Sequence, residues 1–462
     1  MLNPALDNST TIAAISTPPG VGGISVIRLS GPDAFTIADK IWRGKPLSQT
    51  TSHTAHLGTV LDVRGDDLDQ CVATVFVAPR SFTGQNTVEF SVHGSRYVQR
   101  EILASLVQAG ATLAQPGQFT RRAFASGRLE LTRAEAVADI IASNSRASHR
   151  LAMSQLKGSF GNKIARLRQR LLDLVALMEL ELDFSEEDVL FADRTDLRLR
   201  VEEIKTHIER LLQSFRAGNA IRNGIPVAIT GPTNAGKSSL LNALLDYDRA
   251  IVSDIHGTTR DTVEETLEVG DYLFRFVDTA GLRDTADPVE RLGIERSRQA
   301  VSSAHIVLSV IDLTDPQPGM AYAEAVRANL QPHQTHICVY NKSDLHSEPT
   351  PDGSEGLTVS STTHDGLDAL RNALTAAMDK VFGENGSTDA DDVMVTNQRH
   401  AEALGRAHAA AQAMLDGLDS GLPTDIVAMD ARAVLDALGE LTGQITSSEV
   451  LATIFSRFCI GK

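Results

Sequence analysis

The sequence has few cysteines, few aromatic residues and no long apolar run. Its three cysteines, at positions 71, 338 and 459, are far apart and form no C-x-x-C pair. This spacing disfavours a disulfide framework or a structural zinc site and is typical of a reducing compartment. No apolar run approaches the roughly 18 residues of a membrane span, and the N-terminus lacks the pattern of a signal peptide. We therefore expect a cytoplasmic protein without membrane association.

The chain also lacks the positive charge of a general nucleic-acid binder. Its formal net charge is −16, and only 5% of its residues are aromatic. Residues 1–125 carry ten Lys and Arg against nine Asp and Glu, so the remainder carries −17. RNA contact would need a local basic patch. A solvated helix face is the simpler interpretation of the one candidate cluster, which is Lys157, Lys163, Arg166, Arg168 and Arg170.

Three residue patterns along the chain predict a multidomain protein. Residues 1–125 alternate strand-like runs with turn signals, which is typical of an α+β domain. Helical spacing follows over 126–218, with a helix at 197–216 ending near Gly218, and returns over 390–462. Because residues 390–462 are too few to form a stable hydrophobic core alone, we expect them to pack with residues 126–218 as a discontinuous α-helical domain. Residues 219–385 alternate strands and helices, which predicts an inserted α/β domain.

A phosphate-binding loop opens the inserted domain. The pattern G-x-x-x-x-G-K-S runs from Gly231 to Ser238, between the strand-like IPVAIT and the helical LLNALL. The glycines let backbone N–H groups curl around phosphates, and the helix N-terminus adds partial positive charge. Lys237 would reach the β- and γ-phosphates, and Ser238 would bind Mg²⁺.

Three further motifs follow in the order of a Ras-like GTP-binding (G) domain. GTTRD places Thr259 to close on Mg²⁺ and the γ-phosphate, and DTAG places Asp278 and Gly281 beside them. NKSD, residues 341–344, follows a strand, so Asp344 can accept two hydrogen bonds that guanine offers and adenine does not. The motifs predict these GTP-binding residues: Asn234, Ala235, Gly236, Lys237, Ser238, Ser239, Ser253, Asp254, Ile255, His256, Gly257, Thr258, Thr259, Asp278, Thr279, Ala280, Gly281, Asn341, Lys342 and Asp344.

Two segments fit this pattern less well. Ser360 and Ser361 match the usual last base-contacting loop only loosely. Leu282 follows DTAG, where many GTPases carry a glutamine that orients the attacking water. Hydrolysis therefore needs another group.

The whole chain resembles the MnmE (TrmE) family of bacterial tRNA-modification GTPases, within the TrmE-Era-EngA-like superfamily. Besides the G-domain motifs, the resemblance is carried by TPPGVGGISVIRLSG (17–31), RSFTGQNTVEFSVHG (80–94), PGQFTRRAFASGRLELTRAEAVADII (116–141) and SRFCIGK (456–462). It implies a GTPase that works with an FAD-dependent partner, MnmG (GidA). Together they add a carboxymethylaminomethyl group to C5 of the wobble uridine, position 34, of certain tRNAs. A homodimer formed through residues 1–125, and a heterotetramer or larger complex with MnmG, are implied too.

The resemblance also implies how hydrolysis proceeds without the glutamine. Family members use K⁺ and pairing of two G domains, and the cation takes the place of an arginine finger. The K⁺ ligands match Asn234, Ser253, the Ile255 carbonyl and Thr258, and the Mg²⁺ ligands match Ser238 and Thr259. The family's catalytic carboxylate matches Glu290, which the sequence alone would assign to an ordinary acid in a first helical turn.

In the family, the N-terminal domain binds 5-formyltetrahydrofolate, the one-carbon donor. The matching positions are Arg28, Glu89, Arg128 and Lys462. Two departures matter: TGQN (83–86) stands where many relatives have TGED, and Arg128 stands where some carry Lys. We expect Cys459 to be buried, as a small core residue or as a possible reactive thiol near the folate.

Two other functions share the G motifs. A GTP-dependent switch in ribosome or RNA assembly would have the same signatures, but such proteins usually carry a basic RNA-binding module. A nucleotide-binding scaffold without turnover is compatible with Leu282, whereas Asn234 together with Glu290 argues against it.

Overall fold

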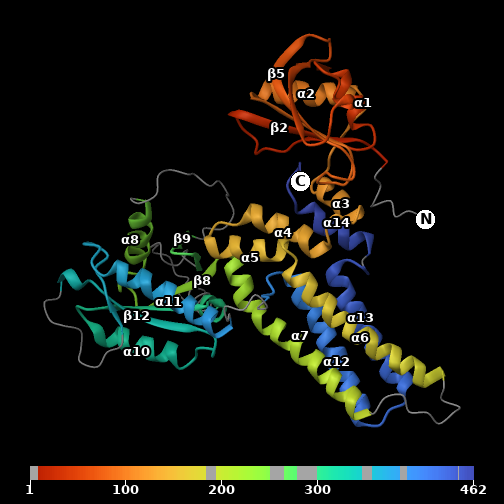
Figure 1. Ribbon diagram of the computed structural model, residues 1–462. Helices are drawn as coiled ribbons and strands as arrows, with labels where there is room; N and C mark the ends of the chain where they lie inside the picture. The colour runs from red at the N-terminus through yellow and green to blue at the C-terminus, as the bar shows by residue number, and fades with distance from the viewer. Residues whose placement is uncertain are drawn as a thin grey trace. The chain divides into compact units, whose positions relative to one another are not determined.

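The chain folds into two compact units (Figure 1). The computed structural model describes residues 9–183, 194–249, 265–277, 299–345, 356–385, 393–445 and 447–461. Unit 1 comprises residues 1–141, 153–205 and 406–462, and unit 2 comprises residues 142–152 and 206–405. Within the described ranges, no helix combines the length and apolar character needed to cross a membrane.

A seven-stranded sheet forms the N-terminal part of unit 1, in the order β3-β4-β5-β6-β2-β1-β7. Alternate residues such as Ile27 and Leu29 in β2 are fully buried, as expected for strands with one face against a core. That core includes Ile37 and Ile102, from the two helices that cover the sheet. The elements are β1 (Ile12–Ile15), β2 (Gly22–Ser30), α1 (Ala34–Lys40), β3 (Trp42–Arg43), β4 (Thr54–Leu61), β5 (Asp67–Phe76), β6 (Thr87–Gly94), α2 (Arg96–Gln108) and β7 (Thr112–Leu113).

Helices from both sides of the α/β insertion pack together in unit 1 (Figure 1). Helix α6 lies against α13, and Arg432 of α13 pairs with Glu179 of α6 at 2.8 Å. Arg198 of α7 likewise pairs with Asp419 of α12 at 2.8 Å. The expected discontinuous helical domain is therefore confirmed. The helices with residues in unit 1 are α3 (Gln118–Ala125), α4 (Leu131–Ala142), α5 (Arg146–Leu156), α6 (Ser159–Asp183), α7 (Arg194–Asn223), α12 (Gln398–Asp419), α13 (Thr424–Thr442) and α14 (Ser448–Ser456). Of these, α4, α5, α7 and α12 also have residues in unit 2.

The expected helix end near Gly218 is wrong, because α7 continues to Asn223. A Cβ at residue 218 would lie 2.3 Å from the carbonyl oxygen of Val395. Glycine therefore serves close packing of two backbones here and does not cap the helix.

Unit 2 contains a six-stranded sheet in the order β13-β12-β11-β8-β10-β9. All neighbouring pairs are parallel except β9 with β10. One core joins this sheet to α8, α11 and the end of α7. The elements are β8 (Ile225–Thr230), α8 (Lys237–Arg249), β9 (Glu265–Val269), β10 (Tyr272–Val277), β11 (Ile306–Asp312), α10 (Pro316–Arg327), β12 (Thr335–Asn341), β13 (Leu357–Thr358) and α11 (Leu367–Asn385). The predicted fold class is confirmed, while the domain limits at 125, 218 and 385 stay predictions.

Candidate functional site

The loop after β8 lies at the carboxyl end of one of the two central strands of the unit 2 sheet, where parallel sheets bind ligands. Its backbone conformation explains its sequence. Gly231 has φ +145°, and a Cβ there would lie 2.4 Å from the carbonyl oxygen of Val310. Gly236 has φ +90°, and a Cβ there would lie 2.2 Å from the amide nitrogen of Asn341. Asn234 lies in the left-handed region at φ +64°, which asparagine tolerates better than most residues.

Lys237 and the start of α8 complete this loop. The helix begins at Lys237, and the N–H of Leu240 donates to the carbonyl of Gly236 at 2.8 Å. The Lys237 ammonium donates to the carbonyls of Gly231 and Pro232 at 3.0 and 2.7 Å. A lysine held over a loop at a helix N-terminus is suited to binding phosphate.

Asn341, at the end of β12, ties the phosphate loop to a second loop. Its side chain is 1% exposed. The amide nitrogen donates to the carbonyls of Ala235 and Gly236 at 3.3 and 3.4 Å. The amide oxygen accepts from the backbone N–H and the hydroxyl of Ser361 at 3.2 and 2.8 Å. The predicted phosphate and base loops therefore meet at one side chain.

Asp344 is held by the same second loop. The hydroxyl of Ser360 donates to Asp344 Oδ1 at 2.6 Å and accepts from the backbone N–H groups of Thr362 and Thr363. Ser360 and Ser361, which fit the motif only loosely, thus contact Asp344 and Asn341 directly. The sequence predicts their role only weakly, because Ser–Ser pairs occur in many loops that bind no base.

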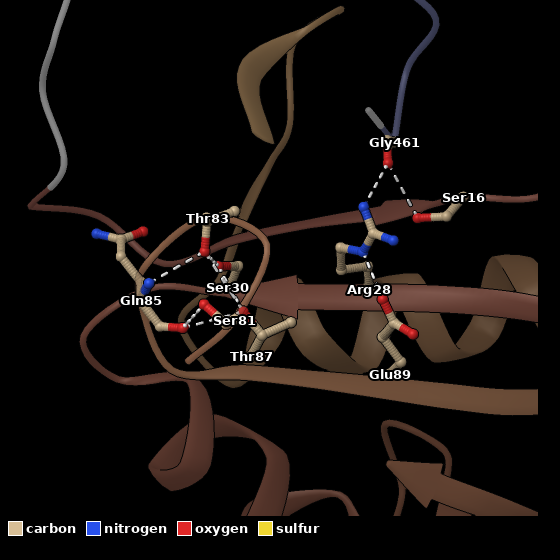
Figure 2. Close-up of polar contacts among 9 residues, drawn as sticks. All are labelled: Ser16, Arg28, Ser30, Ser81, Thr83, Gln85, Thr87, Glu89 and Gly461. Atoms are coloured by element: carbon tan, nitrogen blue, oxygen red, sulfur yellow. Dashed lines mark hydrogen bonds and ion pairs between the residues drawn. The ribbon is translucent and has the colours of Figure 1, made fainter. Parts of the chain in front are cut away.

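A second polar site lies on the sheet of unit 1, where Arg28 and Glu89 are paired residues on β2 and β6. Figure 2 shows the two side chains facing each other, with Arg28 Nε 2.7 Å from Glu89 Oε1. The guanidinium carbon also lies 5.5 Å from the ring centroids of Phe82 and Phe119. The pair is mostly buried, with 15% and 24% of the two side chains exposed. These contacts hold Arg28 in one orientation.

The C-terminal tail reaches this pair (Figure 2). The carbonyl of Gly461 accepts from Arg28 Nη1 and from the hydroxyl of Ser16, each at 3.2 Å. Gly461 has φ +91°, and a Cβ there would lie 2.5 Å from the carbonyl oxygen of Ile15. The glycine of CIGK is therefore required by close approach of two backbones. Lys462 lies outside the described residues.

Cys459 is exposed, so its expected burial is wrong. Beyond α14 the chain leaves helical geometry, and Phe455 and Phe458 occupy the small core beside α3 and α4 while Cys459 faces outward. Its carbonyl accepts from the N–H of Gly117 at 3.3 Å. Arg128 is also exposed and lies beside Gly84, with its Cγ 3.4 Å from the place of a Cβ on that glycine.

Arg122 is not among the predicted site residues and is 1% exposed. Its Nη1 donates to the carbonyl of Thr10 at 2.7 Å and to the side-chain oxygen of Gln85 at 2.9 Å. In the loop that holds Gln85, the hydroxyl of Thr83 lies 2.7 Å from that of Ser30 at the end of β2 (Figure 2). Gln85 belongs to TGQN, so this departure gives a buried arginine a neutral acceptor.

Comparison with known proteins identifies the chain. Sequence models for the GTP-binding protein TrmE N-terminus and for the MnmE helical domain match residues 11–128 and 131–459. Curated proteins named tRNA modification GTPase MnmE match almost the whole chain. The Parabacteroides distasonis protein is 47% identical, covering 98% of this chain and all of the relative, and the Porphyromonas gingivalis protein is 46% identical, covering 98% of both. The chain belongs to the MnmE family.

Among solved structures, the G domain of the T. maritima FeoB iron transporter covers 33% of this MnmE-family chain and 98% of its own length. Its sequence identity is 19% and its TM-score is 0.25, so the family assignment rests on the sequence matches.

Much of the predicted catalytic apparatus of this family lies outside the described residues. Among the described residues, no group of three or more His, Cys, Asp or Glu could hold a metal ion. Asn234 and Ser238, the predicted K⁺ and Mg²⁺ ligands on the phosphate loop, are among the described residues. The remaining predicted residues are Ser253, Asp254, Ile255, His256, Gly257, Thr258, Thr259, Asp278, Thr279, Ala280, Gly281 and Glu290.

Proposed function

We propose that this MnmE-family GTPase binds GTP between the phosphate loop and the NKSD loop and hydrolyses it to drive modification of tRNA. The observation that carries the proposal is the set of hydrogen bonds made by Asn341. They join the phosphate loop to the loop that holds Asp344, so that one ligand with phosphates and a guanine can span both. Lys237 would pair with the β- and γ-phosphates, and Asp344 would accept from the guanine edge.

For hydrolysis we propose one Mg²⁺ and one K⁺ at each nucleotide. A hydroxyl such as that of Ser238 suits Mg²⁺, and an exposed amide oxygen such as that of Asn234 suits a monovalent cation. When bound, K⁺ supplies the positive charge that other GTPases take from an arginine. Glu290 is the proposed group that orients water in place of a glutamine.

The test is GTP hydrolysis in KCl and in NaCl at equal ionic strength, with Glu290→Ala as the variant. We expect at least about tenfold faster turnover in K⁺, and about a hundredfold loss in the variant with GDP affinity nearly unchanged. Glu295→Ala, which removes an acid five residues along the chain, is the matched control. Equal rates in the two salts would contradict the K⁺ proposal, and unchanged turnover would remove Glu290 from the site.

For the chemistry on tRNA, we propose that residues 1–125 bind 5-formyltetrahydrofolate as the one-carbon donor. Arg28, held by Glu89 and by the Gly461 carbonyl, is suited to an anionic or polar edge of the folate. Arg128 and Lys462 would add positive charge, and the exposed thiol of Cys459 is the proposed reactive group. Thiol alkylation of the folate-bound and free protein would test the role of Cys459.

We further propose that the protein acts in the cytoplasm as a homodimer with MnmG as its FAD-dependent partner. Apolar side chains around the start of β2 support pairing there, since Val21 is 79% exposed and Ile24 71%. The product would be carboxymethylaminomethyl at C5 of uridine 34. Nucleoside analysis of tRNA from a deletion strain, with and without the gene restored, tests this. Normal wobble uridines in the deletion strain would favour an RNA-assembly switch instead.

A further inference from the structure

A carboxylate that the G-domain motifs do not include lies beside the NKSD loop. Asp312 is the last residue of β11 and the paired residue of Asn341 on β12. Its Oδ1 accepts from the backbone N–H and the hydroxyl of Thr314 at 2.9 and 2.7 Å. Its Oδ2 accepts from the ammonium of Lys342 at 2.6 Å. The turn therefore fixes one oxygen of the carboxylate, and the other oxygen faces the lysine.

Lys342 is correspondingly constrained. Its backbone lies in the left-handed region at φ +67°, and its side chain is 31% exposed. Its Cε lies 4.0 Å from the place of a Cβ on Gly236, so the side chain runs beside the phosphate loop. Burial alone would raise the pKa of Asp312, but hydrogen bonds from Lys342 and Thr314 outweigh it and lower that pKa. The Asp312 carboxylate is thus charged at neutral pH.

We propose that Asp312 is a positioning residue, which holds the Lys342 side chain where its methylene stem covers the face of the bound purine. The inference rests on the proposed GTP site. Asp344 distinguishes bases by their hydrogen-bonding edge, whereas the face of a purine is much the same in guanine and hypoxanthine. Asp312 therefore contributes affinity for purine nucleotides and no selectivity among them.

The first test is Asp312→Asn, which keeps the shape of the side chain and removes its charge. We expect the dissociation constants of GDP and IDP to rise together by about fivefold, with their ratio unchanged, and the KM for GTP to rise more than kcat falls. Asp315→Asn is the matched control, because Asp315 is exposed three residues along the chain and has the same charge. A change in the ratio of GDP to IDP affinity in Asp312→Asn, or an equal effect in the control, would overturn the proposal.

A double-mutant cycle with Lys342→Met separates positioning from a general structural role. In the methionine background the apolar stem remains, so Asp312→Asn should cost no further affinity. If it costs the same in both backgrounds, Asp312 does not act through Lys342. Lys342→Met alone leaves the Asp312–Thr314 turn intact, so this variant still tests the proposal if Asp312→Asn unfolds. Unweakened GDP binding by Lys342→Met would refute the proposal.

The proposed GTP site is tested by separate experiments. The wild-type protein must first prefer GDP over ADP, and Asp344→Asn must weaken that preference. Loss of either result refutes the GTP site and this inference together, whereas an unaffected Asp312→Asn refutes the inference alone.

Discussion

Replacing Gly461 with alanine tests whether the C-terminal tail completes the proposed folate site. A Cβ at this position would lie 2.5 Å from the carbonyl oxygen of Ile15 and 2.8 Å from Cα of Ser16. Both are backbone atoms and cannot rotate away, so the tail must move by about 0.5 Å or more to reach an allowed contact. That movement stretches the 3.2 Å hydrogen bond from Arg28 to the Gly461 carbonyl.

Gly461→Ala should lower both the folding stability and the affinity for folate. Alanine in the left-handed region costs roughly 1 kcal/mol of folding free energy wherever it is placed. A hydrogen bond from a charged donor contributes about 1.5–3 kcal/mol, and Arg28 keeps its bond to Glu89, so the lower end applies. Since about 1.4 kcal/mol is a factor of ten in affinity, we expect folate to bind about tenfold more weakly.

The assay is calorimetric titration with 5-formyltetrahydrofolate, and the control is Gly65→Ala. Gly65 has φ +89° against +91° for Gly461, but nothing lies within 4 Å of the place of its Cβ. Both variants should lose similar stability from backbone strain, and only Gly461→Ala should lose folate affinity. Unchanged affinity in Gly461→Ala, or an equal loss in Gly65→Ala, would show that the tail takes no part in the site.

Two further predictions concern unit 2. Gly236→Ala should abolish tight GDP binding, measured by fluorescence titration, because its Cβ would lie 2.2 Å from the amide nitrogen of Asn341; retained binding would contradict the loop geometry. Burial, with the positive charges of His333 and Arg216, lowers the pKa of His305 to about 4. Its neutral form is therefore favoured on folding, and its stabilisation is full above pH 6.5 and lost as pH falls toward 4. After allowance for partial exposure, we expect His305→Leu to remove roughly 1–2 kcal/mol of the acid sensitivity measured by urea unfolding between pH 6.5 and 4.5, and an unchanged pH profile would refute this.

Sequence patterns predicted those features that depend on local chemistry. The apolar run IPVAIT became β8 with its expected limits, because a buried parallel strand has a continuous apolar sequence. The packing of residues 390–462 against the earlier helices followed from size alone, since so short a segment buries too little surface by itself. The motif order likewise predicts that NKSD shares a site with the phosphate loop, and Asn341 donates to the carbonyls of Ala235 and Gly236 in that loop.

Features that depend on which distant atoms approach were not predictable in this way. Gly218 resembles a helix end until Val395 is known to lie against it. Cys459 resembles a core residue because its neighbours are apolar, but the direction of its side chain is set by the path of the chain after α14. Asp312 belongs to no motif, and only the register of β11 against β12 places it beside Lys342.

The position of Gly461 also links ligand binding to the fold of unit 1. The tail that carries it follows α14, whose Phe455 packs with Leu131 of α4 in one small core. Arg28 is anchored on the sheet by Glu89, so the proposed folate site is complete only when α14 is docked. A ligand that binds this completed form, and not the undocked one, must stabilise docking by RT ln(1 + L/Kd), where L is the ligand concentration, which is about 2.7 kcal/mol when that concentration is a hundred times the dissociation constant. Folate should therefore slow hydrogen exchange in α14 of the wild-type protein, and it should do so much less in Gly461→Ala, where the tail no longer presents its carbonyl to Arg28.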